Sequence, residues 1–175
     1  MDGFGWQFLQ KNTDRYPFLQ RFVKEGIVSK ITSQFPSTTA AHVTCLNTGL
    51  EVGQSGVYEW FYYEPILDQM ISPLLFSFAG DKEIGTLSKI GASPEDIYPR
   101  ATFYQTLKKA GVSSSVFQQK HIATSPYSSV LFQGAENHPY NDFSSGLASL
   151  AEAIGKGGIF ISILEISMHR LTAMD

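Results

Sequence analysis

The 175-residue chain lacks several features that would place it in a class at once. Its one cysteine, Cys45, excludes an intramolecular disulfide and agrees with a reducing, cytoplasmic compartment. With 13 basic and 16 acidic residues and no basic block, the chain is not expected to bind nucleic acid. The longest apolar runs, such as 71–79 and 159–166, are shorter than the roughly 20 residues of a membrane span. Residues 1–6 lack the basic head and apolar run of a signal peptide.

The residues that are present predict an α/β protein with one buried core. Hydrophobic residues make up 43% of the chain and charged residues 17%, which suffices for a core and argues against disorder. Apolar periodicity predicts helices over 16–24, 40–48, 103–109 and 147–154, and strands over 27–32, 115–118 and 159–166. This alternation indicates a largely parallel sheet covered on both faces. Residues 65–99, rich in glycine and proline, are expected to form a lid or an insertion.

The most informative stretch runs from Phe35 to Leu50, where a cluster of hydroxyl residues precedes the predicted helix. A threonine in the first helical turn lies beside unpaired N–H groups and the positive end of the helix dipole, which favour an anion such as phosphate. Threonine is also a common N-cap, so Thr39 by itself fits a structural cap as well as an anion site.

The wider pattern of Phe-Pro-x-x-Thr, a helix, Thr-Gly-Leu and then Gly56 resembles the nucleophile segment of type I phosphodiesterases and nucleotide pyrophosphatases. These enzymes belong to the alkaline phosphatase superfamily. The Asp2-Gly3 pair resembles the family's other N-terminal hallmark, an aspartate that follows the first core strand and binds a metal. The resemblance implies a three-layer α/β/α sandwich with a mostly parallel sheet, of which residues 1–175 would be the truncated N-terminal part of one catalytic domain.

The resemblance also implies a chemistry. Two divalent cations, usually zinc, flank the phosphate in this family, so Asp2 and Thr39 would bind one of them. Thr39 would attack phosphorus, because a metal can hold its otherwise weakly nucleophilic hydroxyl as the alkoxide. The N–H of Ala40 would receive a phosphoryl oxygen. The substrate would be a phosphate ester or nucleotide-like small molecule; the oligomeric state is not predicted.

One position departs from the family pattern. Better-known members place an asparagine where this chain has Trp60, so stabilisation of the oxyanion by that amide is not expected here. The aromatic segment 59–65 could instead form a platform for a planar group of the substrate, with Trp60 as a substrate-binding residue, or it could pack in the core.

Four other residues have side chains of a type that can catalyse reactions or bind metals. His42 lies about one turn after Thr39 and could face the site or make a structural hydrogen bond. Cys45 is expected to be a buried helix residue without catalytic function. His121 and His138 are placed in loops, lack metal-ligand spacing and receive no role.

The metal-ligand set implied by the family is incomplete. The later Asp-x-x-x-His, Asp-His and His ligands are not recognisable in the sequence, so the chain is expected to be inactive by itself. Two alternatives remain: a non-catalytic remnant that binds an anion or a partner, and a phosphomonoesterase or phosphomutase of the same superfamily.

The tail provides a further expectation, that residues from about 159–175 are out of frame. The family pattern there is similar to Tyr-Phe-Gly-Asp-Ile-Asp-x-x-x-His-x-x-Gly. When each codon is read from its third base, Met168-His169 must give alanine and Met174-Asp175 must give glycine. The remaining codons permit Tyr-Phe-Gly-Asp-Ile-Asp-Ala-Ser-Ala-His-Gly-Tyr-Gly, which carries the missing Asp-x-x-x-His spacing.

Overall fold

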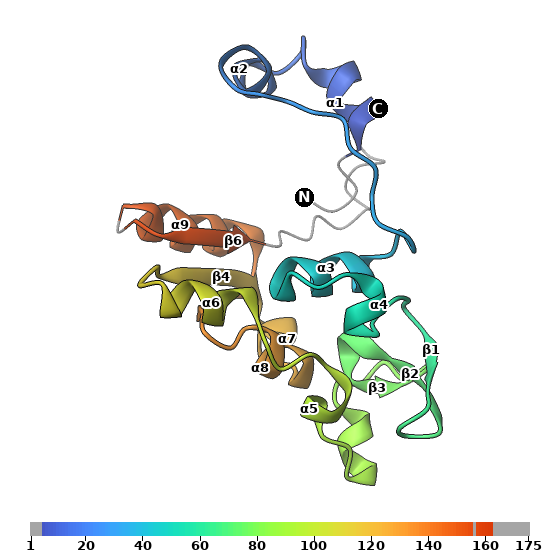
Figure 1. Cartoon of the computed structure of the whole chain (residues 1–175). Coiled ribbons are helices and arrows are strands. Elements are labelled where there is room, and N and C mark those ends of the chain that lie inside the picture. Colours follow the sequence, from blue (N-terminus) through green and yellow to red (C-terminus); the bar gives the residue numbers. More distant parts are fainter. Residues whose placement is uncertain (1–4, 156, 163–175) are drawn as a thin grey trace. The chain divides into compact units, whose positions relative to one another are not determined.

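The computed structural model describes residues 5–155 and 157–162, and Asp2 and most of the predicted out-of-frame tail lie outside them (Figure 1). The chain divides into two compact units, residues 1–33 and 34–175, each described by itself. No helix among the described residues is both long enough and apolar enough to cross a membrane.

The first unit contains α1 (Trp6–Asn12) and α2 (Pro17–Glu25), and α2 confirms the helix predicted over 16–24. The strand predicted over 27–32 is wrong, because these residues adopt no regular structure. Ile27 and Ile31 are 98% and 85% exposed, so the alternating pattern buries neither of these isoleucines. Alternation stabilises a strand only where a neighbouring strand supplies hydrogen bonds.

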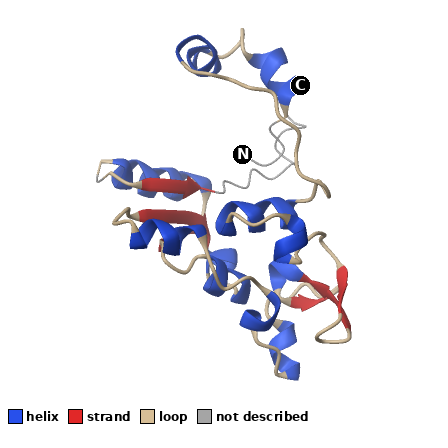
Figure 2. Cartoon of the chain, in the orientation of Figure 1, coloured by secondary structure: helices blue, strands red, loops and turns tan. Residues whose placement is uncertain are grey.

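The second unit contains two sheets and a series of short helices (Figure 2). Its elements are α3 (Thr39–Thr48), α4 (Val52–Ser55), β1 (Tyr62–Glu64), β2 (Gln69–Ser72), η1 (Pro73–Leu75), β3 (Ser77–Phe78), η2 (Thr86–Ile90), α5 (Pro94–Ile97), α6 (Phe103–Lys109), β4 (Ser114–Gln119), α7 (Lys120–Ala123), α8 (Pro126–Leu131), β5 (Glu136–Tyr140), α9 (Phe143–Ile154) and β6 (Ile159–Ser162).

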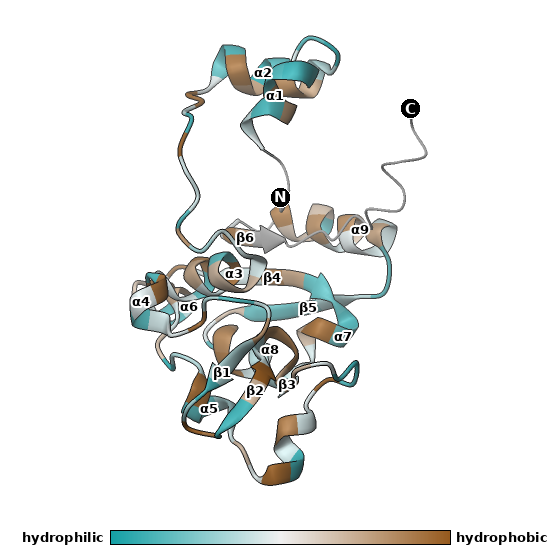
Figure 3. Ribbon diagram, turned by 90° about the vertical axis from the view of Figure 1, so that its right-hand side faces the viewer, coloured by the Kyte–Doolittle hydropathy of each residue, from teal (hydrophilic) through white to brown (hydrophobic). Residues whose placement is uncertain are grey.

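The larger layered part of this unit is built on a parallel sheet with strand order β5-β4-β6. Val116 of central strand β4 packs into a core with Tyr104 of α6 and Val130 of α8. The next residue, Phe117, faces the other way and packs near Ala153 of α9. Helices therefore cover both faces, and the predicted α/β class, consistent with an alkaline phosphatase-like sandwich, is confirmed. Figure 3 shows the hydrophilic colour of β5, which lies at an edge of the described sheet.

Residues 65–99 contain most of the second, antiparallel sheet, with strand order β1-β2-β3. Ile71, Phe76, Leu87 and Tyr98 from this segment are buried in the same core as α3 and α6. The segment is thus anchored by its own apolar side chains, and its function as a lid stays a prediction.

The observed helix boundaries show which helices could be predicted from local sequence signals. Helices α3 and α6 confirm the predictions for 40–48 and 103–109, and Gly49 ends α3 in a left-handed conformation (φ 76°) that a glycine adopts without strain. Helix α9 begins at Phe143, earlier than predicted, because Asp142 caps it. His121 and His138 lie in α7 and β5, so their predicted placement in loops is wrong.

Candidate active site

The start of α3 is held by Thr38, which is its N-cap. The Thr38 hydroxyl accepts a hydrogen bond from the Ala41 N–H (3.3 Å) and donates one to the Tyr58 carbonyl oxygen (2.8 Å). Thr39 is the first residue of the helix proper and is half-buried. The capping function therefore belongs to Thr38, so capping does not account for the second threonine.

The first turn of α3 presents an electropositive environment. The Ala40 N–H lies in this turn, where helix geometry provides no intrahelical acceptor, and the turn contains no acidic residue. An anion beside Thr39 would therefore meet backbone N–H groups and the helix dipole without repulsion from a carboxylate of that turn.

Helix α3 is anchored by buried polar contacts as well as by apolar packing. Thr44 and Asn47 are fully buried; Thr44 Oγ1 lies 2.9 Å from the Tyr127 hydroxyl, and the Tyr104 hydroxyl donates to Asn47 Oδ1 (2.7 Å). Burial raises the pKa of Tyr127 above its ordinary value, with an opposing contribution from hydrogen bonds to Thr44 and Asn47, so this phenol stays neutral. These bonds fix the helix that carries Thr39 to α6 and α8.

The aromatic segment after Gly56 divides between core and surface. Tyr62 is 4% exposed and stacks on Tyr58 with ring centroids 4.6 Å apart. This ring therefore packs in the core, which is one of the two alternatives predicted for the aromatic segment. Trp60, Phe61 and Tyr63 are instead 44 to 51% exposed. Their exposure is compatible with contact to a substrate, and a substrate-binding function of Trp60 stays a proposal.

The remaining sequence candidates lie apart from one another or have structural partners. His42 Nε2 lies 3.5 Å from the Gln34 carbonyl oxygen, which fits the prediction that His42 makes a structural hydrogen bond. Cys45 is a half-buried free cysteine within α3. His138 stacks on Phe117 with ring centroids 4.7 Å apart and lies 3.6 Å from Glu136. Sequence reasoning missed the cap at Thr38 and its bond to Tyr58, because a hydrogen bond spanning 20 residues leaves no local signal.

A metal implied by the family would need several ligands close together. Among the described residues, no group of three His, Cys, Asp or Glu side chains is arranged to hold a metal ion. Thr39 is described but Asp2 is not, so a metal bound by this pair stays a prediction. The donors among the described residues do not make a site for two divalent cations.

Comparison with known protein families identifies a match over most of the chain. The family model described as type I phosphodiesterase / nucleotide pyrophosphatase matches residues 1–149, which is most of the chain. No curated protein and no solved structure matches significantly. Members of the matched family are hydrolases and are generally metal-dependent. The chain, with its hydroxyl-capped α3 and its parallel sheet, belongs to the type I phosphodiesterase/nucleotide pyrophosphatase family.

Proposed function

We propose that this chain derives from a hydrolase of phosphodiesters or nucleotide pyrophosphates in which Thr39 is the nucleophile. The observation that carries the proposal is that two neighbouring threonines occupy different positions at the start of α3: Thr38 caps the helix, and Thr39 is the first residue inside it. A hydroxyl at this point lies where a helix binds a phosphoryl group.

In the proposed reaction the Thr39 oxygen forms a bond to phosphorus while the bond to the leaving ester oxygen breaks. The Ala40 N–H and the helix dipole stabilise the charge on the phosphoryl oxygens. Water then attacks the same phosphorus and releases Thr39. Trp60 would contact the part of the substrate that does not react, since its exposed ring follows the segment bonded to Thr38 through Tyr58.

We also propose that the reading frame changes near the C-terminal end of the chain. The family match ends at residue 149, before the segment from about 159–175 that we propose to be out of frame. Sequencing the gene tests this directly. An in-frame stop codon soon after Asp175, with no family-like continuation in another frame, would eliminate the proposal.

Turnover of bis(p-nitrophenyl) phosphate with added Zn²⁺ tests the catalytic assignment. We expect no hydrolysis by the 175-residue chain and measurable hydrolysis by the frame-restored protein. In the latter, Thr39→Ala should lower kcat by at least about a thousandfold, since the nucleophile is removed. Thr38→Ser, which retains a capping hydroxyl, is the matched control and should keep most of the activity.

Two outcomes distinguish the alternatives. Unchanged turnover in Thr39→Ala would refute the nucleophile assignment. A frame-restored protein that binds phosphate at Ala40 but hydrolyses neither diesters nor p-nitrophenyl phosphate would support the non-catalytic remnant. Hydrolysis of the monoester alone would support a phosphomonoesterase.

A further inference from the structure

The stretch of chain that contains the proposed phosphoryl site carries charge of one sign. Between Lys30 and Lys82 the sequence has no lysine and no arginine, but it has five acidic residues: Glu51, Glu59, Glu64, Asp68 and Asp81. The stretch includes all of α3, the aromatic segment 59–65 and the sheet of β1, β2 and β3. None of the five carboxylates forms an ion pair within the described part of the chain. This stretch therefore offers a ligand negative charge without a lysine or arginine to balance it.

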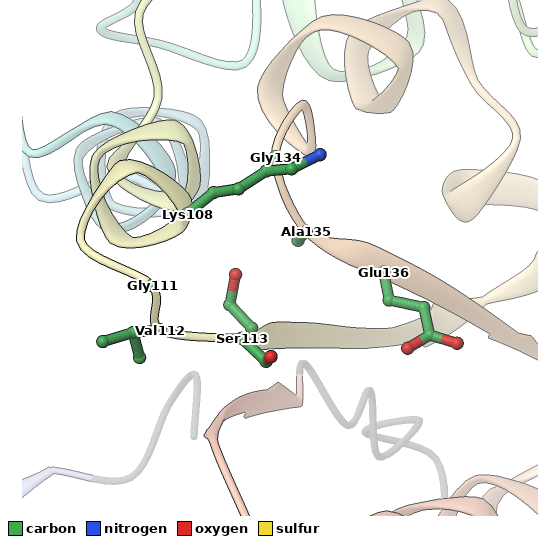
Figure 4. Close-up of a pocket in the computed structure, with 8 residues that line it drawn as sticks. Lys108, Gly111, Val112, Ser113, Gly134, Ala135 and Glu136 are labelled. Carbon is green, nitrogen blue, oxygen red and sulfur yellow. The ribbon is translucent and has the colours of Figure 1, made fainter.

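A cavity at the end of α6 shows a different charge pattern (Figure 4). Its volume is about 440 Å³, and its lining contains one cationic residue, Lys108, and one acidic residue, Glu136. The other lining residues are uncharged. Opposite charges in one lining select neither an anion nor a cation, so a charge preference is found in the stretch around Thr39 and not in this cavity.

Three exposed aromatic rings lie in the acidic stretch. Trp60, Phe61 and Tyr63 are exposed, whereas Tyr62 and Glu64 are buried. Because side chains alternate along a strand, Phe61 and Tyr63 lie on the outer side of β1. The face of an exposed ring attracts a cation, and tryptophan attracts it most strongly. Core packing therefore does not account for these three rings, and their chemistry suits a cationic ligand.

Carboxylates are held next to two of these rings. Glu59 is half-buried, and its Oε1 accepts a hydrogen bond from the Trp60 N–H (2.8 Å). The Tyr63 hydroxyl donates to Asp68 Oδ1 (2.6 Å). A carboxylate supplies charge attraction, and a ring supplies an apolar surface with cation–π attraction. Organic ammonium ions carry both a charge and apolar substituents, so they match this combination.

One hydrogen bond joins this surface to the start of α3. The Thr38 hydroxyl donates to the Tyr58 carbonyl oxygen (2.8 Å), and Glu59 and Trp60 follow Tyr58 directly. Thr39 likewise follows Thr38 directly. The residues with rings and carboxylates therefore continue from a backbone that is bonded to the cap of the helix that carries the proposed nucleophile.

We propose that Trp60 and Glu59 bind an organic ammonium group on the part of the substrate that does not react. The inference rests on the function proposed at Thr39 and narrows its substrate class to phosphodiesters in which one ester group carries an alkylammonium. A nucleotide pyrophosphate brings additional phosphoryl charges, with which arginine and lysine side chains typically pair. The stretch 31–81 contains neither residue.

An NMR titration of the ¹⁵N-labelled full chain with choline, at an ionic strength held constant with sodium chloride, tests the ammonium site. The uncharged counterpart is 3,3-dimethyl-1-butanol, in which carbon replaces the choline nitrogen. We expect choline to shift the Trp60 indole N–H and the Phe61 amide saturably, and the alcohol to bind more weakly.

Variants separate the ring from the charge. Trp60→Leu, followed at the Phe61 amide, should weaken choline binding about threefold to thirtyfold, because it removes the cation–π contact. Glu59→Gln retains an oxygen that can accept from the Trp60 N–H but removes the charge, and should weaken binding about twofold to fivefold. The matched controls are Trp6→Leu, in the first unit, and Glu51→Gln, at the N-cap of α4; both should leave the affinity unchanged.

Turnover by the frame-restored protein connects the ammonium site to the reaction. Glu59→Gln should raise KM about twofold to fivefold for the p-nitrophenyl diester of phosphocholine and leave KM for bis(p-nitrophenyl) phosphate unchanged. An equal change for both diesters would show that Glu59 does not recognise the ammonium group, which overturns the proposal.

Three further results would overturn the ammonium site: equal affinity for choline and the alcohol, equal weakening by Glu59→Gln and Glu51→Gln, or binding of adenosine but not choline at Trp60. Inorganic phosphate, followed at the Ala40 amide, reports the phosphoryl site separately. A chain that binds phosphate but not choline refutes the ammonium site alone. Choline binding without a phosphate shift at Ala40 supports the ammonium site and counts against the function proposed at Thr39.

Discussion

Two helix starts in the same unit, those of α3 and α9, are capped by different chemistry. At α9, Asp142 accepts a hydrogen bond from the Ser145 N–H (3.0 Å), and the Ser145 hydroxyl interacts in turn with the Asp142 backbone. At α3, the cap is the neutral hydroxyl of Thr38, and the first turn contains no acidic residue.

The difference is electrostatic. A carboxylate cap neutralises the positive end of its own helix, so α9 has little electrostatic attraction left for an external anion. A hydroxyl cap satisfies one N–H without adding charge, and the positive end of α3 stays available. The two starts are about equally good at beginning a helix, but of the two only α3 leaves its positive end without a neutralising carboxylate, as the phosphoryl site that we propose at Thr39 requires.

The largest expected effect comes from giving α3 the chemistry of α9. Thr38→Asp keeps a good N-cap but places a carboxylate beside the proposed phosphoryl site. Like charges a few ångströms apart at a partly buried site repel by roughly 1–3 kcal/mol, so phosphate binding at Ala40 should weaken about tenfold to a hundredfold. An NMR titration with inorganic phosphate, followed at the Ala40 amide, measures this effect.

Thr38→Asn is the matched control, because it caps the helix without charge. Its affinity for phosphate should stay close to that of the unsubstituted chain. Equal affinities for the Asp and Asn variants would mean that cap charge does not distinguish the two helix starts.

A smaller effect is expected on the anchoring of α3. Tyr104→Phe leaves the fully buried Asn47 Oδ1 without its 2.7 Å hydrogen bond and should lower the free energy of unfolding by about 1–3 kcal/mol. Urea denaturation provides the measurement. Tyr63→Phe removes a hydroxyl bonded to Asp68 at an exposed position and should change stability by less than about 0.5 kcal/mol. Similar losses in both variants would refute a special contribution of the buried bond.

The smallest effect concerns pH. Hydrogen bonds from Ser145 hold the pKa of the Asp142 carboxyl below its ordinary value. The larger contribution comes from the Ser145 backbone N–H and the smaller one from its side chain. A lowered folded-state pKa means that the stabilisation is present above the unfolded pKa, about 4, and is lost as pH falls through the folded value. Amide exchange in the first turn of α9 should therefore accelerate in acid, whereas the Thr38 cap of α3 does not titrate. Asp142→Asn should abolish this pH dependence; its persistence would assign the effect to another group.

Sequence reasoning succeeded where the signal is local. Gly49 and Gly111 mark the ends of helical patterns, and α3 and α6 lie where those patterns predict them. It failed at 27–32, because whether an alternating segment becomes a strand depends on a distant partner. It started α9 too late because Asp142 and Ser145 form a capping box that the apolar pattern does not report.

The same limit applies to the candidate site. The position of Thr39 in the first helical turn was predictable from residues 35–50, since a cluster of hydroxyls next to a helical pattern is a local feature. The bond between Thr38 and Tyr58 was not, because its two partners are 20 residues apart in the sequence.

The hydrogen bond from Thr38 to the Tyr58 carbonyl has a consequence for how such a protein can diverge. It ties the backbone that precedes Trp60 to the residue that sets where α3 begins. A substitution that moves the Tyr58 backbone to accommodate a different substrate also moves the first turn of α3, and with it Thr39. With Thr39 as the proposed nucleophile, substrate preference and catalytic rate would be coupled in this scaffold, and variants selected for a new leaving group should require compensating changes near Thr38 to recover the rate.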